Sequence, residues 1–123
     1  MRRLTLLALG AALIAPGVSM AQDLKVRVMV DFGEGSRPPI RREVFLAPGA
    51  TVVDATRAAA SLEQGVVCCD PRDVAAIGGL HCDKRAHAFW LYWVDDKSGG
   101  VPAYQYKLKS GDRLVWRYRK VRF

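Results

Sequence analysis

Apolar and polar residues alternate along residues 24–32. The apolar members of this run are Leu24, Val26, Val28, Val30 and Phe32, and most of the intervening positions are charged. Successive side chains of a strand point to opposite faces, so the pattern predicts a half-buried strand. A second strand is predicted over residues 41–46, after a break at residues 33–39 that is rich in glycine and proline.

Residues 51–62 have the spacing of an amphipathic helix. Thr51 is placed to cap its N-terminus, and Asp54, three residues later, can complete a capping box and interact favourably with the helix dipole. The apolar stripe consists of Val52, Ala55, Ala59 and Leu62. Such a narrow, alanine-rich stripe suits a helix that packs closely against a sheet, and Gly65 is expected to end it.

The C-terminal part, residues 89–119, contains all three tryptophans and all four tyrosines. Aromatic residues are enriched in strands. The predicted strands here are residues 89–94, 105–109 and 113–118, with residues 95–100 as a loop, and shorter extended pieces are predicted at residues 66–69 and 74–77. Two strands, one helix and several further strands indicate an α+β domain, in which one helix covers one face of a mixed sheet.

The aromatic residues also suggest where a ligand would bind. Trp90 and Trp93 are three positions apart, so they face opposite sides of a regular strand, and one of them is expected on the open face of the sheet. There it would form a platform for a flat ligand or a partner surface. The predicted ligand-binding residues are Trp90, Tyr92, Asp95 and Tyr104. The alternative, that aromatic side chains only build the core, is our interpretation of Trp116.

The N-terminus has the features of a signal peptide. Arg2 and Arg3 precede an apolar run over residues 4–15, and Ser19 and Ala21 are the small residues that a cleavage site requires. We expect cleavage after Ala21 and a periplasmic or secreted domain of residues 22–123. The apolar run is too short to span a bilayer, and no transmembrane segment is predicted.

The chain is basic, with a formal net charge of +7. Removing residues 1–21 takes away two arginines and no acid, which leaves +5. A basic protein attracts anionic partners, and an anionic surface or an acidic protein is therefore a candidate partner. Export argues against nucleic acid. The alternating arginines near the C-terminus have a simpler interpretation, because charged residues on an exposed strand discourage edge-to-edge pairing.

Three cysteines occur in a chain that is expected to be exported, where disulfides persist. Cys68 and Cys69 would point to opposite faces if they were extended, so only one of them could face Cys82. We predict one bridge from Cys82, with Cys69 favoured over Cys68. The third thiol is left over.

The same region offers a metal-site alternative. Sulfur and imidazole donors lie close together in sequence at Cys68, Cys69, His81, Cys82 and His87, and such donors suit zinc, copper(I) or haem iron. The spacing fits no standard zinc pattern, and a disulfide would remove two of the sulfurs. The sequence contains neither Gly-x-Ser-x-Gly nor His-Glu-x-x-His, which favours a protein that is not an enzyme.

Several short motifs resemble one known family. They are residues 32–35 (FGEG), 49–55 (GATVVDA), 77–79 (IGG), 89–95 (FWLYWVD) and 106–118 (YKLKSGDRLVWRY). In this order they resemble the transcobalamin-like C-terminal domain family, whose members have a ubiquitin-like β-grasp fold. Where that family has a tight Val-Asn-Gly turn, this chain has residues 94–100, which we predict to form a longer loop.

The resemblance implies a function as well as a fold. In transcobalamin and intrinsic factor the corresponding domain closes over one face of cobalamin, so cobalamin or another corrinoid is the implied ligand. We therefore expect an exported binding module that holds a flat small molecule on the open face of the sheet. The alternatives are a protein-interaction subunit of a periplasmic complex and a thiol or metal-binding protein.

The signal-peptide prediction can be checked on the exported protein. Its intact mass and N-terminal sequence should show that it begins at Gln22. The substitution Ala21→Trp should prevent cleavage at this position, because the peptidase requires a small residue there. An exported wild-type chain that still carries residues 1–21 would contradict the assignment.

Overall fold

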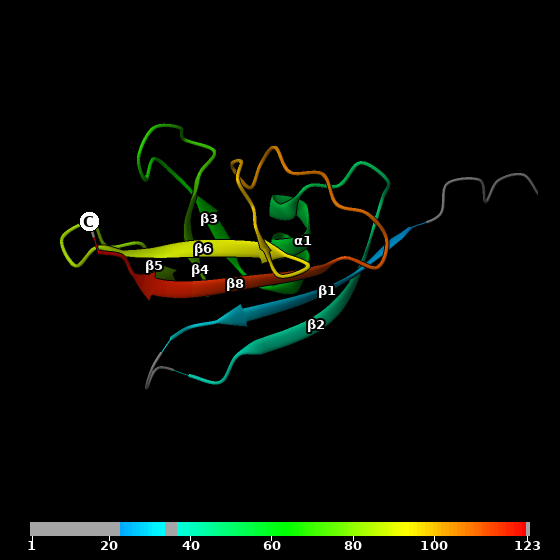
Figure 1. The fold of residues 1–123 in the computed structure, drawn as a ribbon, viewed down its shortest axis with the longest axis horizontal. Helices are drawn as coiled ribbons and strands as arrows, with labels where there is room; N and C mark the ends of the chain where they lie inside the picture. The colour runs from blue at the N-terminus through cyan, green and yellow to red at the C-terminus, as the bar shows by residue number, and fades with distance from the viewer. Residues whose placement is uncertain (1–22, 34–36, 123) are drawn as a thin grey trace, which may run out of the picture.

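The computed structural model describes residues 23–33 and 37–122, so the predicted signal peptide lies outside the described residues. The elements are β1 (Leu24–Asp31), β2 (Ile40–Leu46), α1 (Val52–Ala59), β3 (Leu62–Gln64), β4 (Val74–Ile77), β5 (Leu80–His81), β6 (Ala88–Val94), β7 (Lys97–Ser98) and β8 (Arg113–Lys120). Figure 1 shows α1 and the small strands β3, β4 and β5 on the same side of the larger sheet. The α+β class is confirmed.

The larger sheet is mixed and has the strand order β2-β1-β8-β6-β7. β1 pairs antiparallel with β2 and parallel with β8, and β8 pairs antiparallel with β6. The first and last long strands of the domain are therefore neighbours in the middle of the sheet. A second, three-stranded sheet has the order β3-β4-β5.

The alternation in β1 has the predicted consequence. Val26, Val28 and Val30 are buried, while Lys25 and Arg27 on the other face are exposed. In the parallel register, Val28 lies beside Leu114 and Val30 beside Trp116. These residues form the floor of the core on which α1 packs.

The start of α1 is confirmed and its end is not. The Thr51 side chain accepts a hydrogen bond from Asp54 N, and the Asp54 carboxylate accepts one from Thr51 N, which completes the capping box. The helix ends at Ala59, because Ala60 has an extended backbone. Leu62 then pairs with Ile77 as part of β3, so sheet hydrogen bonds replace the last helical turn that the sequence predicted.

Two predicted strands do not form. Residues 67–69 make a bend, and residues 105–109 form an irregular segment joined to the rest by an isolated bridge between Thr51 and Lys107. Both segments contain β-formers, so local strand propensity alone did not decide their conformation.

The predicted loop over residues 95–100 is also wrong. Asp95 and Asp96 form a two-residue turn between β6 and β7, with Lys97 paired to Val94. Their φ angles are +50° and +68°, and positive φ at both positions is what a tight type I′ hairpin turn requires. Aspartate tolerates this conformation, so the pair takes the place of the Asn-Gly found in the tight turn of the family that the sequence resembles.

No helix in the described ranges is long and apolar enough to cross a membrane.

A buried hydrogen bond connects the sheet to the helix. The Trp116 indole Nε1 donates to Thr56 Oγ1 at 2.7 Å, and the Thr56 hydroxyl donates to Val52 O at 2.7 Å within α1. Trp116 is 2% exposed and Thr56 is fully buried. Water therefore cannot replace the partner of the indole N–H if Thr56 loses its oxygen.

The substitution Thr56→Val should lower the free energy of unfolding by about 1–3 kcal/mol, because it leaves a buried donor without a partner. In a Trp116→Phe background the same substitution should cost at least about 1 kcal/mol less, since no indole N–H remains. Urea denaturation of the four proteins measures the difference. Equal costs in both backgrounds would show that the hydrogen bond contributes nothing.

Candidate functional site

The two predicted ligand residues of β6 lie on the covered face of the sheet. Tyr92 pairs across the sheet with Trp116, whose indole is bonded to α1. Trp90 is 6% exposed, and its indole Nε1 donates to Leu80 O in β5 at 2.8 Å. The prediction that these side chains lie on the open face is therefore wrong. Trp93, three residues from Trp90, is the tryptophan that faces the open side.

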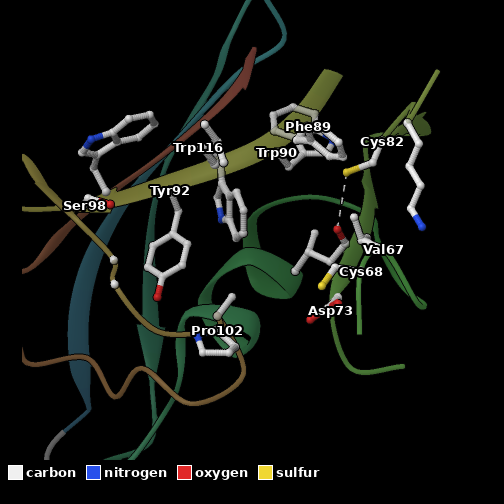
Figure 2. Close-up of a pocket in the computed structure, with 17 residues that line it drawn as sticks. Val67, Cys68, Asp73, Cys82, Phe89, Trp90, Tyr92, Ser98, Pro102 and Trp116 are labelled. Carbon is white, nitrogen blue, oxygen red and sulfur yellow. Dashed lines mark hydrogen bonds between the residues drawn. The ribbon is translucent and has the colours of Figure 1, made fainter. Parts of the chain in front are cut away.

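A cavity of about 550 Å³ lies on this covered side, at the β6 edge of the larger sheet. Its floor is aromatic and includes Trp90, Tyr92 and Trp116. Figure 2 shows the Tyr92 and Trp116 rings side by side above Pro102, with Cys82 and Cys68 farther along. The cavity thus lies where residues 67–74, 82–84 and 98–103 meet the aromatic row of β6.

The two other walls come from irregular segments. One is the segment before β4, with Val67, Cys68 and Asp73, and it is continued by Val74 at the start of β4. The other follows β7, with Gly99, Gly100, Pro102 and Ala103. Lys84 and Ser98 also line the cavity. The lining is mostly apolar with a few polar groups, the combination common in small-molecule sites.

The aromatic floor is held rigidly by ring contacts. Trp90 packs edge-on against Phe32 and Trp116, with ring centroids 5.6 and 6.4 Å apart. Tyr92 lies 5.2 Å from Trp116 in a tilted arrangement and packs edge-on against Tyr106. Such contacts stabilise by about 0.5–1.5 kcal/mol each beyond area burial.

Tyr92 also joins the floor to the segment after β7. Its hydroxyl donates to Val101 O. Its ring lies against Gly99, where a Cβ atom would collide with it. Burial raises the pKa of Tyr92 from 10.0 to about 12, so the hydroxyl remains a donor at neutral pH. Glycine at position 99 is therefore required for this wall to approach the tyrosine.

Asp95 and Tyr104 do not line the cavity. Asp95 sits in the β6–β7 turn, where its carboxylate accepts a hydrogen bond from Arg113 N at 2.9 Å, and this bond lowers the pKa of Asp95. The Tyr104 hydroxyl donates to Asp70 Oδ2 at 3.2 Å. Both side chains have clear structural partners in positions where we predicted ligand contacts.

Asp70 is the centre of a small polar cluster beside the cavity wall. The Arg72 guanidinium bonds both of its carboxylate oxygens, at 2.9 and 3.0 Å, and lies 4.2 Å from the Tyr104 ring centroid. The hydrogen bonds from Arg72 hold the pKa of Asp70 well below its usual range. The cluster anchors the segment after Cys69 to the segment that carries Tyr104.

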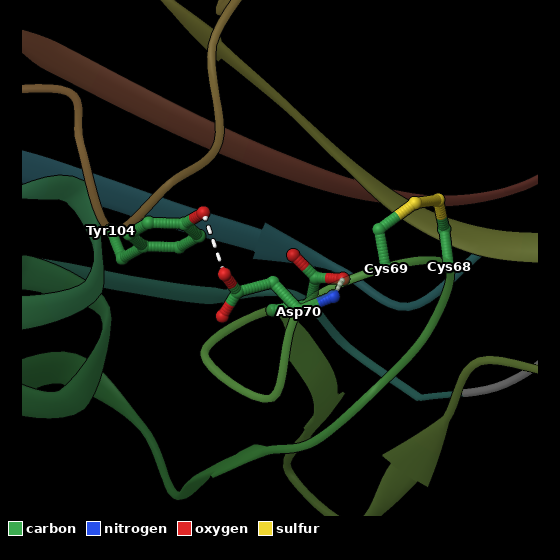
Figure 3. Close-up of a disulfide and its surroundings, with 5 residues drawn as sticks. Cys68, Cys69, Asp70 and Tyr104 are labelled. Carbon is green, nitrogen blue, oxygen red and sulfur yellow. Dashed lines mark hydrogen bonds between the residues drawn. A yellow bond between two sulfur atoms is a disulfide. The ribbon is translucent and has the colours of Figure 1, made fainter.

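The predicted disulfide from Cys82 is wrong. The structure joins Cys68 to Cys69 (Figure 3). It leaves Cys82 as a free thiol. The prediction assumed that the two neighbours were extended and faced opposite sides. Residues 67–69 instead form a bend, which lets adjacent side chains turn toward each other.

Cys82 lines the cavity near Trp90. Its Sγ lies 3.8 Å from Val74 O, and burial raises the pKa of the thiol. At neutral pH it is thus mostly protonated, and a protonated thiol is a poor nucleophile.

The metal-site alternative is not supported by the geometry. His81 Nε2 lies 3.4 Å from Glu63 Oε1, and His87 lies in the turn before β6 with a φ of +54°. Among the described residues, no three His, Cys, Asp or Glu side chains are grouped so that they could hold a metal ion.

Sequence reasoning missed most of the cavity walls. Val67, Pro102 and Ala103 carry no motif, and Trp116 was interpreted as core only. The one available signal was the pair of glycines at positions 99 and 100, which allows a close backbone approach.

The chain matches one family model in sequence and several solved structures in fold. A family model described as "Domain of unknown function (DUF4430)" matches residues 49–120, more than half of the chain. No curated protein matches the sequence. Solved structures of similar fold and low sequence identity include the following two.

The first is haptocorrin in complex with Cbi, with a TM-score of 0.62 and 14% identity over 81% of this chain. The present chain spans only 26% of the haptocorrin chain. The second is a "putative metal binding protein" from Ruminococcus gnavus ATCC 29149, with a TM-score of 0.57 and 13% identity. That match covers 80% of this chain and 99% of the other.

The cysteine pairing predicts the thiol content of the protein. Unfolded without reductant, the chain should titrate one thiol, and the Cys82→Ala variant should titrate none. In the folded protein, Cys82 should react slowly with iodoacetamide at neutral pH and faster as the pH rises, because its pKa is raised. A proteolytic fragment that links Cys82 to Cys68 or Cys69 would contradict this pairing.

Proposed function

Because the chain belongs to the family described as domain of unknown function (DUF4430) and resembles part of haptocorrin in fold, we propose that it is a binding module without enzymatic activity. The bound molecule would occupy the cavity between β6 and the two irregular segments. This site replaces the open-face site that the sequence suggested.

One observation carries the proposal, the aromatic floor of a preformed cavity. Trp90, Tyr92 and Trp116 present ring surfaces whose positions are fixed by hydrogen bonds to Leu80, Val101 and Thr56. A rigid aromatic wall binds flat molecules with little loss of side-chain entropy. At about 550 Å³, the cavity lies within the usual range of about 300–1,000 Å³ for small-molecule sites.

The ligand we propose is flat and largely apolar, and a corrinoid is the first candidate. The support is the resemblance to the transcobalamin-like C-terminal domain family together with the fold shared with haptocorrin. Exposed lining residues such as Lys84 and Pro102 open the cavity to solvent, so one edge of a larger macrocycle would enter it. Lys84 and Asp73 would then meet polar side arms.

The assignment as a binding module draws further support from Cys82. Its raised pKa weakens it as a nucleophile, although it is the thiol in the cavity.

We also propose that residues 1–21 are a signal peptide and that residues 22–123 are one exported domain. The β1–β2 hairpin, the helix on one face and the parallel β1–β8 pair support a β-grasp assignment.

The neighbouring residues Val66 and Val67 allow a matched test. Val67 lines the cavity, whereas Val66 is 63% exposed and does not. The substitution Val67→Trp should fill the entrance and weaken binding at least about tenfold, which corresponds to about 1.4 kcal/mol. The control Val66→Trp should change affinity less than about twofold, since the added ring points into solvent.

Equilibrium dialysis against cobinamide, followed by its visible absorbance, measures both variants. Retention of cobinamide by the wild-type protein with the expected difference between the two variants supports the proposal. If the wild-type protein retains none, the corrinoid assignment fails. If Val67→Trp binds as well as the wild type, the ligand does not use this cavity.

A further inference from the structure

The open face of the larger sheet, opposite the cavity, carries an apolar strip bordered by arginines. Met29 on β1, Val115 on β8 and Trp93 on β6 are direct neighbours across three adjacent strands. Arg41 on β2 continues the same row beyond Met29. This row, Met29–Val115–Trp93, is called the apolar strip below.

Guanidinium groups lie on both sides of the apolar strip. Along β8, Arg113 and Arg117 are each two residues from Val115, so their side chains share its face. Arg27 lies beside Arg113 on the neighbouring strand. Arg117 also stands over the Trp93 ring, 5.2 Å from its centroid.

The arginines outnumber the acids that could neutralise them. Four arginines and two carboxylates that line a hollow of about 540 Å³ belong to this face: Arg27, Arg41, Arg113 and Arg117 against Glu43 and Asp96. Asp96 is paired with Arg113 at 2.6 Å, and Glu43 lies 3.9 Å from Lys25. Within the described residues, Arg27 and Arg41 make no ion pair. The hollow therefore has an excess of positive charge.

We propose that this face binds an acidic, extended polypeptide segment of a partner protein. Arg113 and Arg117 are four strand residues apart, roughly 13 Å. An extended segment along β8 places every second side chain against the sheet at the same spacing. A segment in which acidic and apolar residues alternate at those positions would put one carboxylate beside Arg27 and Arg113 and another opposite Arg117. Its apolar side chain would lie between the half-exposed Met29 and Trp93, because Val115 between them is only 8% exposed.

The shape and composition of the face favour a polypeptide over other anions. A lipid surface or a nucleic acid would be attracted by charge alone and would not need the apolar strip. Arginine, tryptophan and methionine together are typical of protein interfaces. The hollow lies on the other side of the sheet from the cavity, so this proposal does not depend on the small-molecule site.

The test uses the purified protein and a fluorescein-labelled peptide in which glutamate and leucine alternate, separated by single serines. A peptide of the same composition with contiguous glutamates is the comparison. Fluorescence anisotropy should show tighter binding of the alternating peptide, with affinity falling as salt rises. Arg27→Glu should weaken binding about tenfold, because an attraction becomes a repulsion. Arg85→Glu, an equal charge change at an exposed turn residue outside the hollow, should leave it within about twofold.

A substitution of the half-exposed Met29 distinguishes this proposal from binding by charge attraction alone. Met29→Gln should weaken the alternating peptide several-fold and leave the contiguous-glutamate peptide unchanged. Circular dichroism of each variant confirms that it is folded. Equal affinity for both peptides would overturn the proposal, as would equal effects of Arg27→Glu and Arg85→Glu. Binding to phosphatidylglycerol vesicles in the absence of peptide binding would replace it with a membrane surface.

Discussion

The hydrogen bond from Trp116 to Thr56 fixes the helix on the sheet, and the cavity depends on this contact. β8 lies between β1 and β6, so Trp116 touches the helix on one side and the aromatic row of β6 on the other. Sliding α1 along the sheet would expose apolar core and also leave a buried indole N–H without an acceptor. The position of the cavity floor is therefore set by the core of the domain.

Alternation along single strands gives the two faces of the sheet different chemistry. On β6, Trp90 and Tyr92 point toward the helix, whereas Trp93 points to the open side. On β8, Leu114 and Trp116 are core residues, while Arg113 and Arg117 border the apolar strip. One short sheet can therefore present an aromatic cavity on one face and a cationic surface on the other, and Trp93 on β6 belongs to the border of both.

The cysteines lie in the least regular part of the domain. The bend that carries the Cys68–Cys69 disulfide forms one wall of the cavity, and the hydrogen bonds between Asp70, Arg72 and Tyr104 anchor it. A loop held by side-chain bonds instead of strand pairing can place adjacent side chains on the same side. For this reason a rule derived from extended strands gave the wrong disulfide.

Local patterns in the sequence determined β1, β2, the capping box of α1 and the aromatic strands, because periodicity and capping act over a few residues. The sequence also showed that Trp90 and Trp93 face opposite sides. It could not decide which of them is covered, since alternation gives relative orientation only. That choice, the meeting of residues 67–74 with residues 99–103, and the arginine hollow depend on strand order and register. These follow from the packing of distant segments, which only the tertiary structure decides.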